Sequence, residues 1–428
     1  MCAASGGGEA VRAGPPPAQT QVPNAEYPPA FLEAVKAAVA KGVQALRDAQ
    51  QMDGSWGPLL YRDHYPGGQT ALALTTLLKC GVPPRDRGIT KGFSYLKSAH
   101  ACQRTYEVGL VLMALGAKYE APEGPEAPPE VASAGEPPES PKDSMPKEDR
   151  EWIKKEVAFL REAQQADGLW GYPAEPPGLA DRNYASPTWT DLSNTQYAIF
   201  GLRAAKRCGI EVEPGLWARA LTQLLKWQAQ KGPATTLKGN TVRGPTRTEW
   251  TEPAKARGFG YADSIKNAEA TGSMTAAGTA ALMICAEAMG DDFTPAQRTT
   301  VREGVRDGLA WIQDRFSVQK NVGRDAAAEY YLYYMYGLER VGDLSYMRFF
   351  GTQDWYQLGG QRLMEKQKKS GGWDIGFSLN SLIKSKGESD IAQDVTDTCF
   401  ALLFLCRGTP RLARPIVTPD PVPTPPGK

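Results

Sequence analysis

The chain has 428 residues, 41% of them hydrophobic and ten of them Trp, with a formal net charge of +1. This composition supports a sizeable buried core, and the near-zero net charge argues against a general nucleic-acid-binding protein, which normally carries a basic excess. No run approaches the roughly 18 apolar residues of a membrane-spanning helix, so we predict no transmembrane segment.

The N-terminal residues 1–28 are rich in Gly, Ala and Pro and predict a disordered leader. They lack the charged and then apolar pattern of a signal peptide. Cys2, followed by small residues and a loose linker, also suits the mature end of a lipoprotein whose signal has been removed. The localisation therefore stays open between the cytoplasm and the cell envelope.

A spaced element recurs along the chain and is its strongest signal. It reads as an aliphatic residue, three residues, Gln, three residues and Gly-x-Trp. The complete copies are Leu46/Gln50/Gly54/Trp56, Leu160/Gln164/Gly168/Trp170 and Leu363/Gln367/Gly371/Trp373. Partial copies at residues 91–96, 224–228 and 308–312 complete six units, each of which opens with an amphipathic helix.

A more apolar helix follows each amphipathic one, and a helix that is apolar on most faces is buried by its neighbours. These helices are predicted to start near Thr70, Tyr106, Leu192, Met274, Glu329 and Val395. Glycine favours the left-handed residue that closes a helix, and the predicted ends are Gly81, Gly116, Gly209, Gly290, Gly342 and Gly408. The alternation predicts an all-α protein: an α/α toroid, or α6–α6 barrel, of six helical hairpins with inner and outer rings, over residues 29–411.

The Gln-x-x-x-Gly-x-Trp element resembles the QW repeat of squalene-hopene and oxidosqualene cyclases. The twelve-helix plan is also similar to that of protein prenyltransferase β subunits. The resemblance implies a terpenoid cyclase-like fold in which the repeated Gln and Trp side chains tie the outer helices together. It says little about activity, because one fold hosts unrelated functions.

The predicted loops differ on the two faces of the ring. Loops from inner to outer helices are short, except for a Pro/Glu-rich insert at residues 119–148 that predicts disorder. Loops from outer to inner helices are long, the longest at residues 230–270, and a Pro-rich tail follows at residues 412–428. Because long loops on a rigid scaffold commonly carry binding and catalysis, we expect the site at this long-loop mouth, opening into a central cavity.

Polar residues gather at the predicted starts of the inner helices, on this mouth. The candidate catalytic acids are Glu107, Asp191, Glu329, Asp394 and Asp397. The candidate ligand-binding polar residues are Asn194, Gln196, Ser273 and Thr275. Asp and Ser are also favoured helix N-caps, and acids in the first turn complement the helix dipole, so each of these residues has a structural alternative.

The stretch Asp394-Val395-Thr396-Asp397-Thr398-Cys399 resembles the Asp-x-Asp-Asp-Thr-Ala motif of squalene-hopene cyclases. In those enzymes the middle Asp protonates a terminal alkene or epoxide. Thr396 occupies that position here, and a hydroxyl of ordinary acidity cannot protonate an alkene. The sequence therefore argues against the standard cyclase mechanism.

Residues Asp397 and Cys399 also resemble the Asp-x-Cys zinc ligands of prenyltransferase β subunits. That site needs a His on a following inner helix, and the chain has only His64 and His100, both in the first repeat. A catalytic zinc with three protein ligands is then improbable, and we predict no metal and no cofactor. The seven cysteines form no C-x-x-C pair and predict free thiols.

Aromatic residues near the expected cavity are further ligand-binding candidates: Trp189, Tyr330, Tyr334 and Trp355. Rings of this kind hold an apolar chain and stabilise cationic charge through cation–π contacts. Filling of the protein core is the equally simple alternative.

Three functions stay open from the sequence. The leading one is a squalene-cyclase- or prenyltransferase-like protein whose cavity binds an apolar or isoprenoid-type ligand without the standard cyclase acid. The second is a non-catalytic scaffold that binds a protein partner through the long-loop rim. The third is an α/α-barrel enzyme, a lyase or a glycan-active enzyme, that uses relocated acids and tyrosines. The sequence does not decide whether the protein is an enzyme.

Overall fold

The computed structural model describes residues 19–57, 67–98, 104–119, 145–172, 189–243, 245–262, 269–290, 292–323, 330–375 and 388–417. One set of helices is α1 (Pro29–Asp48), α4 (Arg87–Ser98), α6 (Lys147–Ala163), α8 (Pro214–Trp227), α10 (Pro295–Asp314) and α12 (Trp355–Lys366). The alternating set is α3 (Gly68–Lys79), α5 (Thr105–Tyr119), α7 (Leu192–Arg207), α9 (Gly272–Met289), α11 (Tyr331–Ser345) and α13 (Glu388–Leu405).

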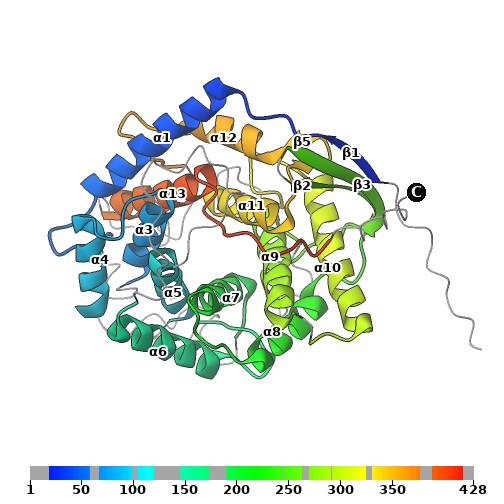
Figure 1. Cartoon of the computed structure of the whole chain (residues 1–428), viewed down its shortest axis with the longest axis horizontal. Coiled ribbons are helices and arrows are strands. Elements are labelled where there is room, and N and C mark those ends of the chain that lie inside the picture. Colours follow the sequence, from blue (N-terminus) through cyan, green and yellow to red (C-terminus); the bar gives the residue numbers. More distant parts are fainter. Residues whose placement is uncertain are drawn as a thin grey trace, which may run out of the picture.

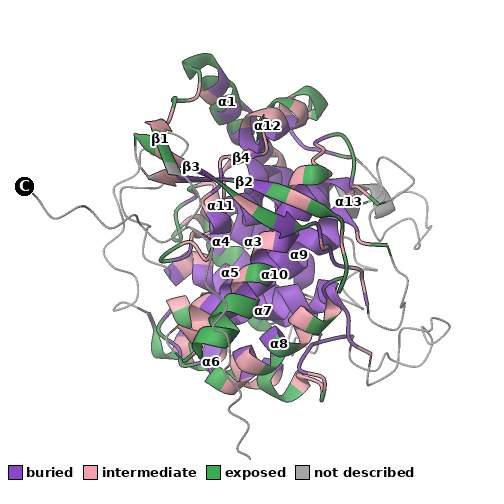
Figure 2. Ribbon diagram, turned by 90° about the vertical axis from the view of Figure 1, so that its right-hand side faces the viewer, coloured by how far each residue is buried: buried purple, intermediate pink, exposed green. Residues whose placement is uncertain are grey.

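The two sets form two layers (Figure 1). Each helix of the second, inner set packs on the next inner helix in chain order, and α13 packs on α3, so this set closes on itself. The first set lies outside it. The inner helices are buried on nearly all sides, whereas the outer helices expose one face (Figure 2). The predicted alternation of amphipathic and apolar helices therefore corresponds to this division, and the protein is predominantly helical.

The Gln of each complete repeat holds the end of one outer helix to another outer helix. Its Nε2 donates to the carbonyl of the repeat's own Gly and to a carbonyl on the neighbouring outer helix. The pairs of acceptors are Gly54 and Gly88 for Gln50, Gly168 and Leu216 for Gln164, and Gly371 and Ala38 for Gln367, all at 2.8–3.0 Å. Since Ala38 lies in α1, the last of these joins closes the outer layer.

The Gly and Trp of the repeat complete this joint. Gly54, Gly168 and Gly371 have φ between +92° and +94°, and an added Cβ would lie 2.5–2.7 Å from a carbonyl oxygen of the neighbouring outer helix. Only glycine fits such a position without strain. Each Trp indole donates to the carbonyl ten residues earlier, at 2.7–2.8 Å.

A threonine on the following inner helix accepts a hydrogen bond from the backbone N–H of the Trp in each complete repeat. The N–H groups of Trp56, Trp170 and Trp373 donate to Thr70, Thr195 and Thr398 at 3.0–3.1 Å. Each repeat thus joins its own outer helix, a second outer helix and the next inner helix.

The expected loop at residues 230–270 contains a β-hairpin, which corrects the purely helical prediction. Strands β2 (Ala234–Arg243) and β3 (Thr246–Lys255) pair antiparallel. Threonines favour extended backbone, while Leu237 and Trp250 are buried, and the Trp250 ring lies over Gly239. Ion pairs hold the hairpin and the residues just after it to α10: Arg302 and Arg306 to Glu252 at 2.6 and 3.3 Å, and Arg257 to Asp307 at 2.7 Å.

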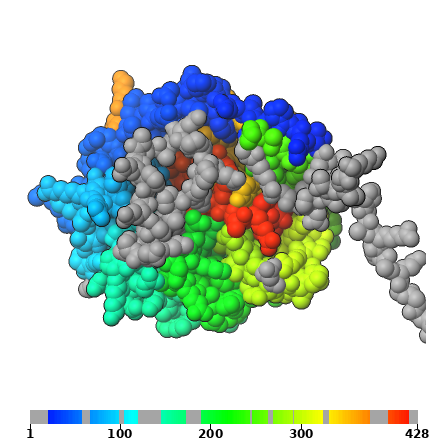
Figure 3. Space-filling model, viewed as in Figure 1, coloured from blue at the N-terminus to red at the C-terminus, as the bar shows by residue number. Residues whose placement is uncertain are grey.

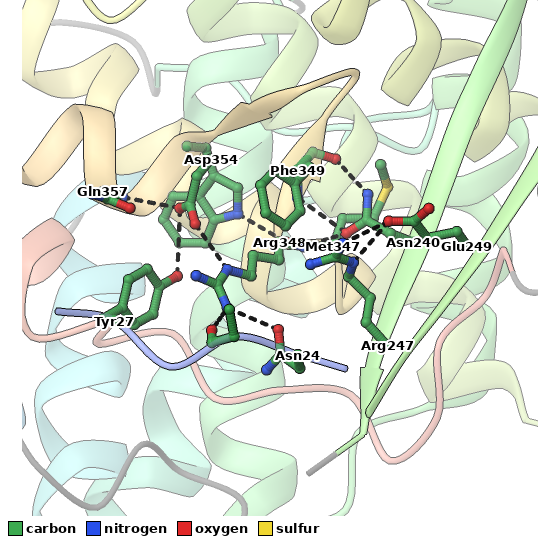
Figure 4. A network of polar contacts seen from close by, with 12 residues as sticks. Asn24, Tyr27, Asn240, Arg247, Glu249, Met347, Arg348, Phe349, Asp354 and Gln357 are labelled. Atoms are coloured by element: carbon green, nitrogen blue, oxygen red, sulfur yellow. Dashed lines mark hydrogen bonds and ion pairs between the residues drawn. The ribbon is translucent and has the colours of Figure 1, made fainter. Parts of the chain in front are cut away.

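Part of the predicted disordered leader is also ordered. Strand β1 (Gln19–Pro23) pairs with β3 and gives the sheet order β1-β3-β2. Behind it, Arg348 holds the N-terminal segment by donating to Asn24 and to the carbonyl of Ala25, by pairing with Asp354 at 2.8 Å, and by lying over the Tyr27 ring (Figure 4). The small sheet of β4 (Phe349–Phe350) and β5 (Gln353–Asp354) lies beside this network. The rest of the leader, residues 1–18 with Cys2, lies outside the described residues.

Residues 406–417 form a strap across the inner layer, so that the first part of the predicted Pro-rich tail is packed rather than free. In Figure 1 the strap runs from the end of α13 across the middle of the ring, and Figure 3 shows its red atoms at the centre of that face. Arg203 of α7 donates to the carbonyls of Pro410 and Arg411 at 2.7 and 2.8 Å, and Leu412 is buried.

Three of the predicted closing glycines have positive φ just after a helix, namely Gly81, Gly209 and Gly290. Gly116 and Gly342 instead lie inside α5 and α11. Close packing explains Gly342, because an added Cβ would meet the Trp355 ring. The position that closes α11 is the left-handed Tyr346. Residues 120–144 of the predicted insert lie outside the described residues, and none of the described helices is long and apolar enough to cross a membrane.

The joint at Gln367 makes a stability prediction. Replacing Gln367 by Ala removes two hydrogen bonds, one of which closes the ring on α1, and we expect a loss of about 2 kcal/mol in the free energy of unfolding, measured by urea titration. Gln165→Ala is the matched control, because the Gln165 amide donates only to the nearby Ala163 carbonyl. Equal effects of the two substitutions would contradict the proposed role of the joint.

Candidate functional site

Asp191 is fully buried at the start of α7 and acts as its N-cap. Its carboxylate accepts from the backbone N–H of Asn194 at 2.7 Å, from the Asn194 amide at 2.8 Å, and from the Tyr261 hydroxyl. Burial raises the pKa of Asp191 to about 7, although these hydrogen bonds work in the opposite direction. The structure therefore brings Asp191 and Asn194 together as a capping pair.

Glu107 in the first turn of α5 is also buried and receives backbone donors. It accepts from the N–H of Gly67 at 2.9 Å and from that of Gly68, and so anchors the start of α3. Burial raises the pKa of Glu107 to about 7. Two of the predicted catalytic acids thus hold helix starts, in agreement with the capping alternative.

The Asp394–Cys399 stretch lies inside α13, which begins at Glu388 rather than at Asp394. Asp397 is buried and accepts from the N–H of Ile375 at 2.8 Å. Thr396 accepts from the Gln69 amide at 3.1 Å. The side chain of Asp394 and the whole of Glu329 lie outside the described residues, as do His64 and His100.

Ser273 and Thr275 of α9 are buried and tied to loops. Ser273 exchanges hydrogen bonds with the Asn321 amide at 2.9 and 3.1 Å. Thr275 accepts from the N–H of Phe259 at 3.1 Å and so occupies the same role as the threonines of the complete repeats. The structure does not bring either residue to the other polar candidates on α7.

The four aromatic candidates are dispersed. Tyr334 points toward the loop after α10, where its hydroxyl donates to the Ser317 carbonyl at 2.8 Å. Tyr330 is the left-handed residue before α11, and Trp189 lies with its carbonyl against Gly171. Trp355 is buried at the start of the outer helix α12 and donates to the Met347 carbonyl at 2.7 Å, so it belongs to the opposite face from the predicted mouth.

A different set of side chains meets inside the inner layer. The hydroxyl of Ser193 on α7 bonds to the hydroxyl of Tyr106 on α5 and, at 2.7 Å, to that of Tyr333 on α11. The Gln196 amide also donates to Tyr333. Because α9 separates α7 from α11 in the inner ring, these bonds reach across the interior. Tyr106 and Tyr333 are only partly buried.

Aromatic rings surround these hydroxyls. Tyr197 lies 4.7 Å from Tyr106 and 6.4 Å from Tyr333 between ring centroids. Phe400 of α13 lies 5.8 Å from Tyr333 and 5.7 Å from Tyr336. We call Tyr106, Tyr197, Tyr333, Tyr336 and Phe400 the interior aromatic cluster; it draws on four inner helices.

The guanidinium of Arg340 lies against this cluster, further along α11. Its central carbon is 4.0 Å from the Tyr336 centroid, 4.5 Å from Phe200 and 5.9 Å from Tyr197. Arg340 is 2% exposed. Its Nε and Nη1 atoms have no hydrogen-bond partner among the described residues.

Comparison with known proteins supports the fold. No protein-family model and no curated protein matches the sequence. Among solved structures, the chain is similar to a variant of the type II terpene cyclase MstE from Scytonema in complex with its product merosterolic acid A, with a TM-score of 0.50 and 13% sequence identity over 88% of this chain and 98% of that chain. The chain has a terpenoid cyclase-like fold. At this identity the likeness concerns the fold alone.

The described part of this terpenoid cyclase-like chain offers no group of three or more His, Cys, Asp or Glu side chains that could hold a metal ion. Cys399 is buried, which raises the pKa of its thiol to about 12. The described cysteines form no disulfide bond with one another; they are Cys80, Cys208, Cys285, Cys399 and Cys406.

Sequence reasoning missed most of the interior residues. On α11 the spacing i, i+3 and i+7 relates Tyr333, Tyr336 and Arg340. On α7 one face carries Ser193, Gln196 and Tyr197. The sequence therefore contained the helical spacing that places each set on one face of its helix. However, an inner helix is buried on several sides, and periodicity alone cannot tell which side faces the interior. Among the predicted site residues whose side chains the structure describes, Gln196 contacts the cluster.

Asp191 makes a pH-dependent contribution to stability that can be tested. Its pKa is raised from 3.8 to about 7 on folding, so its stabilising contribution is full below about pH 4 and is lost as the pH rises through 7. In Asp191→Asn the new amide can still cap α7, and that dependence disappears. We expect the wild type to lose about 2 to 3 kcal/mol more than this variant between pH 5 and pH 8.

Urea unfolding at a series of pH values measures this difference. Glu148→Gln, which changes an exposed acid on α6, should leave the wild-type pH profile unchanged. Parallel profiles for the wild type and Asp191→Asn would show that Asp191 is ionised in the folded protein.

Proposed function

We propose that the two layers form an α/α toroid whose interior binds an apolar, isoprenoid-type ligand. The observation that carries the proposal is the interior aromatic cluster, in which side chains from four inner helices converge. Tyr106 and Tyr333 remain partly exposed there, as expected for walls of a space that is reached from the long-loop mouth. A concave apolar site with a few polar groups is the usual form of a small-molecule site.

The chemistry of the cluster suits such a ligand. Aromatic rings pack against an apolar chain and carry negative electrostatic potential on their faces, which stabilises any developing positive charge. The hydroxyls of Tyr106, Ser193 and Tyr333 satisfy one another. The rings can therefore face a ligand without leaving these polar groups unpaired.

The proposal is for binding and does not include the standard cyclase proton transfer. Thr396 stands at the position of the cyclase acid, and Asp397 is engaged by the backbone of Ile375. Neither group is an obvious proton donor to an alkene. The likeness to a type II terpene cyclase supports the fold that encloses the interior and leaves the reaction undetermined.

Relocated acid catalysis is the second candidate, and Asp191 is the residue that favours it. Its pKa of about 7 leaves it partly protonated at neutral pH, and its Tyr261 partner in turn bonds to Tyr172. A group with this pKa suits proton transfer to or from an oxygen or nitrogen atom. Turnover that is lost in Asp191→Asn, with ligand binding retained, would support it.

Binding is tested first with the protein from its own host, by native mass spectrometry with lipid extraction, and then by titration with farnesol. We expect Tyr333→Leu to weaken farnesol binding about tenfold or more, because an aromatic wall is lost. Tyr334→Leu is the matched control: it lies on the same helix but points toward Ser317.

Circular dichroism shows whether each variant is folded before it is titrated. Equal losses of affinity in the two variants would remove the interior as the binding site. Absence of any bound small molecule, together with co-purification of a macromolecule, would favour the scaffold function at the long-loop rim.

A further inference from the structure

We infer that Arg340 binds an oxyanion, so that the ligand of this protein is an apolar chain with a carboxylate or phosphate head. The inference rests on the proposed binding function and deepens it. The observation behind it is a buried guanidinium inside the ring with two nitrogen donors that lack an acceptor among the described residues.

An arginine cannot escape this situation, because its guanidinium keeps its charge in proteins. Burying a charge without a partner is costly, and buried charges are therefore normally paired. The three rings around Arg340 offset part of that cost through cation–π contacts. Ring faces do not supply the lone pairs that Nε–H and Nη1–H require.

The acids beside Arg340 on α11 are engaged elsewhere. Glu339 accepts from the backbone and hydroxyl of Thr409, at 3.0 and 2.8 Å. Asp343 pairs with Arg407. Both partners belong to the strap of residues 406–417. Arg407 balances the charge of Asp343, and burial together with the nearby Asp343 raises the pKa of Glu339, which favours its neutral form.

Glu287 on α9 also has other partners. It forms an ion pair with Arg203 at 2.9 Å and accepts from the N–H of Ala413 at 2.8 Å. The strap therefore covers this end of the interior, and Arg340 has no carboxylate partner among the described residues. Its side chain hydrogen-bonds with Tyr197, while Nε and Nη1 lack an acceptor. A planar guanidinium presents parallel donors that fit the two oxygens of a carboxylate or phosphate.

The placement also orients the ligand. Tyr333 is nearer the start of α11 and Arg340 lies seven residues further along, about 10 Å deeper at the helical rise. An apolar chain can then lie along the interior aromatic cluster while its anionic head contacts Arg340 near the strap.

Three probes that share one apolar chain test this inference: farnesol, farnesoic acid and farnesyl diphosphate. We expect the wild type to bind at least one anionic probe about tenfold or more tightly than farnesol, as a charge-assisted hydrogen bond in a buried site predicts. The probe with the higher affinity distinguishes a carboxylate head from a phosphate head.

Arg340→Met retains the length of the side chain and removes its charge. We expect it to bind all three probes with affinities within about twofold of its farnesol affinity, since only the head contact is lost. Arg315→Met is the matched control, because Arg315 also lies over an aromatic ring, that of Trp311, but at the end of an outer helix. It should retain the wild-type preference.

The unliganded variants give a second readout. An unpaired buried charge costs free energy in the folded state, whereas removing one partner of a buried ion pair is strongly destabilising. We therefore expect the urea midpoint of Arg340→Met to equal or exceed that of the wild type. If this variant does not fold, the inference is overturned, because Arg340 is then a structural side chain; the wild-type probe series is independent of that result.

The remaining outcomes separate the two proposals. Equal wild-type affinities for the three probes overturn the anion site and leave the binding function standing. A preference for anionic probes that persists in Arg340→Met also overturns the role of Arg340. If none of the three probes binds, the proposed binding function fails and the anion site fails with it.

Discussion

The structure depends on one repeated joint, in which a Gln, a Gly and a Trp fix the end of an outer helix against a second outer helix. The Gln donates two hydrogen bonds. The Gly lets the neighbouring backbone approach closely, where a side chain would clash, and the Trp indole donates to a carbonyl of the helix that precedes it. Since Gln367 reaches back to α1, the same local chemistry that links successive hairpins also closes the ring. The rest of the architecture follows from that closure.

Closure places the inner helices where nearly every face is covered. Their polar residues must then find partners inside the protein. Glu107 and Asp191 each receive a backbone N–H at a helix start, and Asp397, inside α13, receives one from Ile375. Acids that the sequence pattern predicts to be catalytic thus stabilise loops and helix starts. Arg340 differs from these acids, because two donors of its buried, charged side chain lack an acceptor among the described residues. This contrast is why a ligand contact is inferred there and not at the acids.

The two chain ends complete the ring in different ways. The N-terminal segment adds a strand to the hairpin and is held by Arg348, on the outside (Figure 4). The C-terminal strap crosses the inner layer, accepts from Arg203 of α7, and engages Asp343 and Glu339 of α11 through Arg407 and Thr409. One end therefore stabilises the rim, while the other closes one side of the interior and sets the charge that remains within it.

The sequence by itself determined the repeat, the order of amphipathic and apolar helices, and thereby the terpenoid cyclase-like fold, because the spacing of Gln, Gly and Trp is local and a glycine with positive φ has few substitutes. It did not determine the β-hairpin, because the threonine-rich segment was predicted to be a loop. Glycine is needed at position 239 because a Cβ there would clash with the Trp250 ring, a contact that only the folded hairpin creates. Nor did it select Tyr333 over Tyr334, although the two are adjacent. Only the tertiary structure decided which side of α11 faces the interior and which carboxylates were already paired, because both depend on residues far apart in the chain, from Ser193 to Thr409, that the ring brings together.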